Sequence, residues 1–227
     1  MKKNLFIIAI AACLVAIVAC GSLAYFTGSS TVTNKFMVAS SDDPQPGPGP
    51  DEIFGISLTE TTPEGGETDE GNTYDNIEPG TVVDKKPVIK NTGKFDQWVR
   101  ITLTLTKGDK WLAADDSFTA ANLFDKLVAG NTGSGYVSTD WVRVDPDDVD
   151  GDNNLVYTFY YNARLTPEDD PVALFEKVTV PSCLENDDMK ELSEFNIIIK
   201  ADAIQADNTG ASAKETFEST DPIYWED

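Results

Sequence analysis

The sequence of 227 residues contains no histidine. This absence excludes Ser-His-Asp and Cys-His catalytic pairs, His-ligated zinc sites and the side chain that most often exchanges protons near neutral pH. Basic residues are also scarce, with 17 Lys and Arg against 39 Asp and Glu, which gives a formal net charge of −22. Because nucleic-acid affinity depends on Lys and Arg neutralising phosphates, we expect no nucleic-acid partner.

Cysteine is nearly absent beyond the first 20 residues. Of the three cysteines, Cys13 and Cys20 lie close to the N-terminus, and only Cys183 lies further along the chain. A single cysteine cannot form an internal disulfide, so we expect the folded part to be stabilised by an apolar core. No basic residue stands next to Cys183 to activate its thiol, and we expect this side chain to be a small buried apolar group.

Residues 1–24 have the three-part layout of a secretory signal peptide. Two lysines precede the apolar run Leu5–Cys20, and Ser22 and Ala24 supply the small residues that a signal peptidase requires. The pattern predicts cleavage between Ala24 and Tyr25, and therefore a secreted protein. The apolar run of 16 residues is shorter than the roughly 20 that span a membrane, although a retained N-terminal anchor is an alternative.

A second alternative concerns Cys20. The stretch Ile17–Gly21 resembles a bacterial lipobox, in which the cysteine becomes a lipidated N-terminus. The two interpretations differ in their product. One is a freely exported chain that begins at Tyr25, and the other is a chain tethered to the cell surface by lipid on Cys20.

Three further segments follow the signal peptide. Residues 25–39 contain an alternating pattern that predicts a strand with Val32, Phe36 and Val38 on one face. Residues 40–51 alternate proline and glycine and are typical of an extended linker. Residues 52–227 carry the strand signals of one large domain. A strand that is separated from its domain by such a linker is unusual, because it can pair with its own domain or with another copy.

The domain is predicted to be all-β. The clearest strand is Trp98–Thr106, where Val99, Ile101 and Leu103 alternate with polar residues as in a half-buried antiparallel strand. Further strands are predicted at 53–60, 82–90, 141–144, 155–165, 174–180 and 195–206. Helical spacing predicts short helices at 117–129 and 187–194 in the connections, and a final one at 211–217. Many strands with little helix predict an antiparallel β-sandwich.

The densest cluster of acidic residues includes Asp147, Asp148, Asp150 and Asp152. Calcium prefers six to eight oxygen ligands, so these carboxylates are candidates for a weak Ca²⁺ site. The EF-hand spacing fails, however, because Tyr157 stands where that loop requires a bidentate Glu. A solvated turn rich in Asp, Asn and Gly is the favoured interpretation. No other cofactor is expected.

The other acidic pairs, such as Asp115-Asp116, are expected at the surface of a chain with 39 acidic residues. The sequence contains no glycine-rich phosphate loop, no nucleophile elbow and no metal-ligating cysteine spacing. It therefore predicts a protein without a catalytic site.

Several segments together resemble the TasA/camelysin family of exported proteins, which carry signal peptides of the SipW type. The matching segments are Leu23–Thr27, Thr31–Phe36, Asn76–Gly80, Ile89–Gly93 and Ala201–Asp207. The resemblance spans most of the chain. It departs from the family at residues 40–51, which look like an insertion. It also gives no basis for the metalloprotease activity described for some members, since H-E-x-x-H and histidine are absent.

The resemblance implies a jelly-roll-like sandwich, secretion from a Gram-positive bacterium and a structural role in biofilm-matrix fibres. Such fibres are thought to form when each subunit donates its N-terminal strand to the next. Here Val32, Phe36 and Val38 would be the donated side chains, the partner would be a second copy, and other matrix proteins or polysaccharide would be further partners. Folding of the strand onto its own domain is left open. A lipid-anchored sandwich that binds a carbohydrate or protein ligand is the alternative function.

Overall fold

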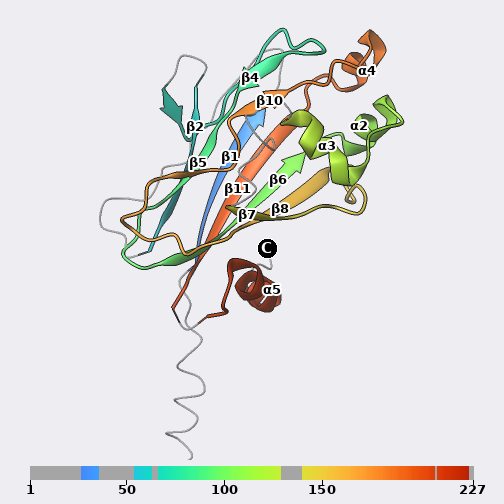
Figure 1. Cartoon of the computed structure of the whole chain (residues 1–227). Helices are drawn as coiled ribbons and strands as arrows, with labels where there is room; N and C mark the ends of the chain where they lie inside the picture. The colour runs from blue at the N-terminus through green and yellow to red at the C-terminus, as the bar shows by residue number, and fades with distance from the viewer. Residues whose placement is uncertain (1–26, 36–53, 63–65, 129–139, 208, 225–227) are drawn as a thin grey trace, which may run out of the picture.

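The structure, a computed structural model, describes residues 27–35, 54–62, 66–128, 140–207 and 209–224. Within these residues it is a β-sandwich of antiparallel strands, so the predicted fold class is confirmed (Figure 1). The jelly-roll connectivity stays a prediction. The predicted signal peptide, residues 1–24, and the predicted linker, residues 40–51, lie outside the described residues.

The strands form three sheets. The five-stranded sheet, called sheet A, has the order β1 (Thr27–Lys35), β11 (Asn196–Gln205), β6 (Gln97–Leu105), β8 (Leu155–Tyr161), β7 (Trp141–Val144). Sheet B has the order β3 (Glu67–Thr68), β2 (Ile56–Thr61), β5 (Pro87–Asn91), β9 (Val172–Ala173). A two-stranded ribbon pairs β10 (Lys177–Thr179) with β4 (Val82–Asp84). All strand pairs are antiparallel.

The central strands of sheet A follow the alternation of the sequence. Val99, Ile101, Leu103 and Leu105 of β6 are all buried on the face that looks toward sheet B. Their partners on β11 are also apolar, and Leu103 stands opposite Ile199. Because successive side chains of a strand point to opposite faces, this alternation gives sheet A one dry face and one face of mixed polarity.

Aromatic rings fill the core where β8 meets the helix α3 (Ala120–Leu127). The ring of Phe124 lies 5.0 Å from Phe159, 5.5 Å from Tyr157 and 6.0 Å from Phe175, measured between centroids. These are tilted and edge-to-face arrangements at the spacing that aromatic pairs prefer. Phe124 thus ties the helix to sheet A and to the chain that follows β9.

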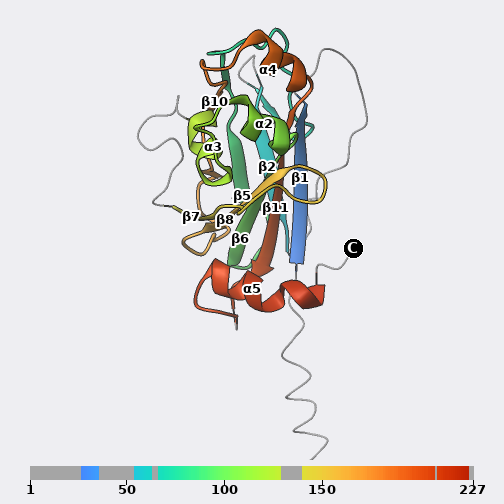
Figure 2. The ribbon, with the colours of Figure 1, turned by 90° about the vertical axis from the view of Figure 1, so that its right-hand side faces the viewer.

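Three short helices lie in the connections and a longer one ends the described chain. Helices α2 (Gly108–Ala114), α3 and α4 (Asn186–Glu191) lie at the end of the sheets opposite α5 (Ala213–Tyr224), as Figure 2 shows. The predicted α3 began too early, because Thr119 caps the helix through a reciprocal pair of hydrogen bonds with Asn122. Helix α2 was not predicted, and α5 extends past Phe217.

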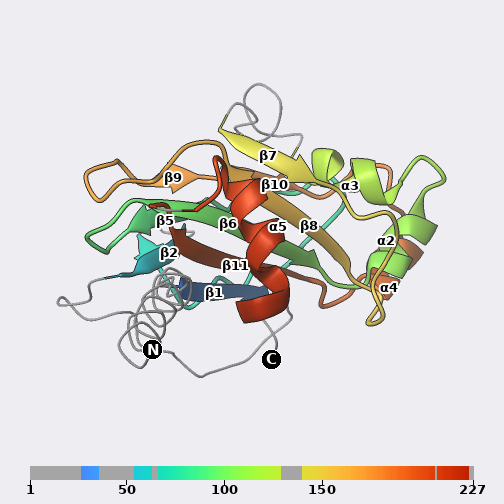
Figure 3. The same ribbon diagram turned by 90° about the horizontal axis from the view of Figure 1, so that it is seen from below.

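Helix α5 covers one end of the outer face of sheet A (Figure 3). Its buried Phe217 packs against Trp98 of β6, Tyr160 of β8 and Ile204 of β11. The guanidinium of Arg100 lies 4.6 Å above the Phe217 ring and bonds Asp202 at 3.0 Å. A second, smaller apolar cluster therefore exists outside the sandwich, and its one charged pair is compensated.

Two predicted strands are interrupted, and a third, 174–180, is reduced to β10, because residues 174–176 leave the ladder between β9 and β10. The stretch 82–90 divides into β4 and β5, because Lys85 and Lys86 leave the ladder before Pro87. The stretch 155–165 ends as β8 at Tyr161, and Leu165 returns only as an isolated bridge to Gln97. The alternation of apolar residues in the sequence located the buried positions correctly, but it did not show where the strands are interrupted.

We expect Phe124→Ala to lower the free energy of unfolding by about 3–5 kcal/mol, because a buried ring shared by three neighbours leaves a cavity that the core cannot refill. Chemical denaturation measures this change. The matched control is Phe95→Ala, since Phe95 is 37% exposed, and its effect should stay below about 0.5 kcal/mol. Equal losses for the two variants would contradict the central position of Phe124.

Candidate functional site

Strand β1 is the first of the described strands and one of the two edge strands of sheet A, the other being β7 (Figure 2). It pairs antiparallel with β11 of its own domain over nine residue pairs, from Thr27 opposite Ile204 to Lys35 opposite Asn196. The structure of the single chain thus shows the folded-back arrangement that the sequence left open. Donation to another copy stays a prediction.

The three predicted donor residues have different outcomes. Val32 lies within β1, where its register partner is Ile199, a residue buried in the core. Phe36 and Val38 lie outside the described residues, as do Cys20, Ala24 and Tyr25. None of the described helices is long and apolar enough to cross a membrane.

Strand β11 supplies the surface against which β1 lies. Ile197, Ile199, Ala201 and Ala203 of β11 are buried on the core face. From Ile197 to Ala203 the core face of β11 therefore carries only apolar side chains, and β1 extends this face at the edge of the sheet. On the other side β11 pairs with β6, and β1 is thus the strand that completes its hydrogen bonding.

The acidic loop of residues 145–154 forms a tight turn. The carboxylate of Asp150 accepts the backbone N–H of Asp152 at 2.9 Å and of Asn154 at 2.8 Å. The Asn154 hydrogen bond is the main cause that lowers the pKa of Asp150 below its ordinary value. The loop also positions α2, because the Asn153 carbonyl accepts the Gly108 N–H at 2.6 Å.

The candidate calcium ligands are not brought together. Asp148 accepts the N–H of Val149, while Asp147 and Asp152 are exposed on the turn. Across the ranges that the structure describes, no group of three or more acidic or cysteine side chains is placed to hold a metal ion. The geometry is that of the Asx turn that Asp, Asn and Gly favour.

Cys183 differs from its prediction. The side chain is exposed and not buried, because it follows β10 at a turn that starts with the buried Pro181. Partial desolvation is the main cause that raises the pKa of the Cys183 thiol, and the negative charge of Asp115 raises it further. The thiol is therefore held in its less reactive form.

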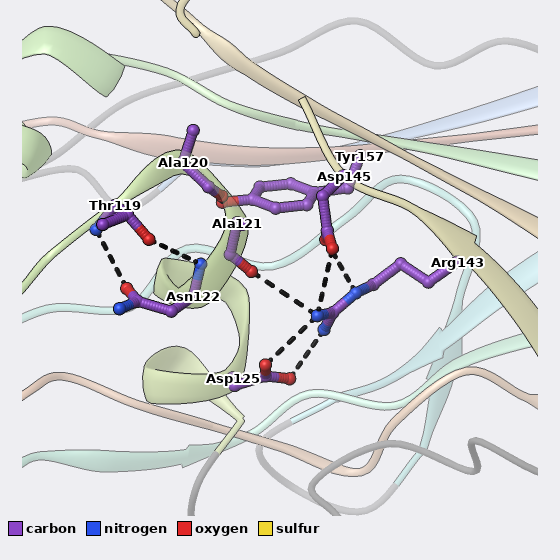
Figure 4. A network of polar contacts seen from close by, with 8 residues as sticks. All are labelled: Thr119, Ala120, Ala121, Asn122, Asp125, Arg143, Asp145 and Tyr157. Carbon is purple, nitrogen blue, oxygen red and sulfur yellow. Dashed lines mark hydrogen bonds and ion pairs between the residues drawn. The ribbon is translucent and has the colours of Figure 1, made fainter. Parts of the chain in front are cut away.

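An ion-pair network that the sequence did not reveal joins α3 to the edge of sheet A (Figure 4). Arg143 of β7 bonds both oxygens of Asp125, at 2.6 and 3.1 Å, and its Nε lies 2.7 Å from Asp145. Its guanidinium also lies 5.4 Å from the centre of the Phe124 ring. Beside it the Tyr157 hydroxyl donates to the Ala120 carbonyl at 2.7 Å, and burial raises the pKa of this phenol. The network positions α3 and keeps every charge compensated.

A second unpredicted pair joins β2 of sheet B to the segment between β4 and β5. The Nζ of Lys85 is 2.5 Å from Oε1 of Glu60, and both side chains are completely buried. Burial lowers the pKa of Lys85 to about 8, although the neighbouring Glu60 opposes this shift. The only hint in the sequence was a lysine placed between two apolar strand segments.

A hollow on the described surface is lined by charged and polar side chains of both signs, including Lys107, Lys110, Asp152 and Glu191. No aromatic side chain lines it. The aromatic run of β8 is turned inward instead, where Tyr157 and Phe159 belong to the core and Tyr160 lies under α5. A flat aromatic platform for a sugar is therefore not formed by this run.

Comparison of the chain with known protein families, with curated proteins and with solved structures gives no match.

We expect Asp150→Ala to lower the free energy of unfolding by about 1 kcal/mol at pH 7, because two backbone N–H groups lose their acceptor. Asp147→Ala is the control and should change it by less than about 0.5 kcal/mol. The pKa of Asp150 is lower in the folded state than in the unfolded state. Its contribution to the free energy of unfolding is therefore fully present above the unfolded pKa of about 3.9, and it is lost as the pH falls through the folded-state pKa. Denaturation at pH 7 and at acidic pH tests both statements. A difference between variant and parent that persists in strong acid would contradict this role.

Proposed function

We propose that the protein is a secreted, non-catalytic structural subunit of an extracellular matrix, and that it assembles with copies of itself into fibres by exchanging β1. The observation that carries the proposal is the position of β1. It is an edge strand, it is the first of the described strands, and it pairs with β11 over nine residue pairs. The resemblance to TasA-like proteins leads to the same function.

Exchange conserves the contacts that hold β1. When β1 of one copy lies on β11 of the next, the same nine residue pairs form as in the single chain. The two arrangements therefore differ mainly in chain entropy and in the connecting segment, as in domain swapping. Protein concentration then decides which arrangement dominates.

A free β11 edge favours exchange over simple opening. If β1 leaves, the backbone N–H and C=O groups on one side of β11 lose their partners, and the buried Ile197 and Ile199 lose a neighbour. An incoming strand restores both kinds of contact, which is the principle of strand addition. The chain between β1 and Phe54 is rich in proline and glycine, a composition that gives reach to a connection. Because each subunit both donates and accepts, the contact is head-to-tail and generates a filament.

A disulfide that locks β1 to its own β11 tests the exchange. Thr31 and Lys200 are register partners, and directly opposed Cα atoms of antiparallel strands lie about 4.5–5.5 Å apart, within the Cα–Cα range of about 4.4–6.8 Å that a disulfide spans. We expect the oxidised Thr31→Cys/Lys200→Cys variant, made in a Cys183→Ser background, to remain monomeric. Reduction of the same sample should restore filaments, and electron microscopy measures both states.

Mixing supplies the control. A Thr31→Cys chain and a Lys200→Cys chain, each with Cys183→Ser, should form a disulfide between chains inside filaments, because exchange places the two positions opposite each other. Filaments that form equally well from the locked monomer, or mixed filaments without this crosslink, would exclude strand exchange.

Charge predicts how assembly depends on solution conditions. The net charge of −22 becomes −24 once Lys2 and Lys3 leave with the signal peptide, so subunits repel one another. We expect filaments to form faster as salt shortens the screening length to about 10 Å at 0.1 M, and also as acid neutralises carboxylates near pH ~4. Light scattering across salt and pH measures this. Assembly that slows as salt is added would contradict it.

A further inference from the structure

The buried side chains of Glu60 and Lys85 lie in contact and are close enough to react with each other. Glu60 ends the buried face of β2, and Lys85 lies in the short segment between β4 and β5. The two side chains are completely buried, and Nζ and Oε1 lie 2.5 Å apart. We propose that Glu60 and Lys85 condense to an internal amide that covalently joins β2 to the segment between β4 and β5.

Burial makes the ionised pair costly. Two opposite charges taken out of water lose their hydration, and their mutual attraction repays this only in part. An amide carries no charge and takes the place of both groups. Buried charges cannot be hydrated, so conversion of the ion pair to a neutral amide removes the free-energy cost of keeping two charges in the interior.

The same burial makes the amine reactive. Because desolvation lowers the pKa of Lys85 to about 8, a neutral amine with a free electron pair is accessible near physiological pH. The phenol of Tyr74 responds to the same negative charge. Burial is the main cause that raises its pKa, and the Glu60 carboxylate raises it further.

The contact between the Lys85 amine and the Glu60 carboxyl group makes a separate activating reagent unnecessary. Amines and carboxylates in water do not condense, because both are ionised and water drives the reverse reaction. Two groups held in contact act at effective concentrations of about 10⁵–10⁸ M, and the dry interior keeps water away from the product. Both groups are anchored by the sheet around them, because Glu60 pairs with Pro87 in the ladder and the Lys85 N–H donates to the Glu176 carbonyl at 3.0 Å.

The reaction balances without a further reactant. One proton of the Lys85 ammonium passes to the Glu60 carboxylate, which gives a neutral amine and a carboxylic acid. The amine nitrogen attacks Cδ of Glu60, the C–N bond forms, and one C–O bond breaks. The departing oxygen takes up the second proton and leaves as water, so the ion pair becomes one amide and one water molecule with no oxidation or reduction.

The amide would give the domain a covalent crosslink, which its single cysteine cannot form. Cys183 has no partner for a disulfide once the first 24 residues are removed, and a link between residues 60 and 85 constrains the unfolded chain in the same way as a disulfide would. The inference concerns the subunit alone and does not depend on whether β1 is exchanged.

Intact mass spectrometry of the denatured, purified protein tests the proposal directly. We expect the wild-type mass to be lower than the sequence mass by one water molecule, and fragmentation of a digest to recover one branched peptide that contains Glu60 and Lys85. The Lys85→Arg chain cannot form the amide and should have its full sequence mass.

Lys86→Arg is the matched control, since Lys86 pairs with Glu176 at 3.5 Å while both side chains are exposed to water. This variant should still lose one water molecule. A full sequence mass for the wild type would overturn the proposal. So would a loss of water that persists in Lys85→Arg, or a digest in which the Glu60 and Lys85 peptides separate. If Lys85→Arg does not fold, the wild-type mass and its digest decide alone.

Discussion

The antiparallel pairing of β11 with two strands is the interaction on which sheet A depends. On one side β11 pairs with β6, the most regular strand of the chain, and on the other side with β1. The first pairing joins two segments of the same continuous domain. The second pairing is made with β1, the first of the described strands, at an edge of the sheet. The stability of sheet A and the assembly proposed above therefore both depend on β11, because β11 needs a neighbouring strand and the pairing itself does not specify which copy supplies it.

The sequence predicted the parts of the fold that local alternation determines. Strands β6 and β11 were placed to within one residue at each end, since their apolar positions repeat every second residue. Helix α2 was missed because seven residues carry too little periodicity, and its position depends on the loop carbonyl of Asn153. The break between β4 and β5 was missed for a related reason, because Lys85 turns inward to reach Glu60, a residue distant in the sequence.

The candidate site was predictable only in part. A strand near the N-terminus followed from composition, but its register on β11 is a tertiary property that no local pattern contains. The Arg143 network and the Glu60–Lys85 pair both join residues from separate elements, and charged residues are ordinarily expected at the surface. The exposure of Cys183 was mispredicted because the prediction rested on the usual burial of cysteine, whereas this residue stands in a turn after β10.

The separation of the two apolar clusters affects the tryptophan fluorescence of the protein. Trp111 and Trp141 belong to the core of the sandwich, whereas Trp98 lies in the small cluster under α5, with its indole N–H donated to Thr209. Indole emission depends on the polarity around each ring. Among the tryptophans of the described chain, loosening of the C-terminal helix would therefore change the emission of Trp98 and leave that of the other two unaltered, so that fluorescence distinguishes undocking of α5 from melting of the sheets.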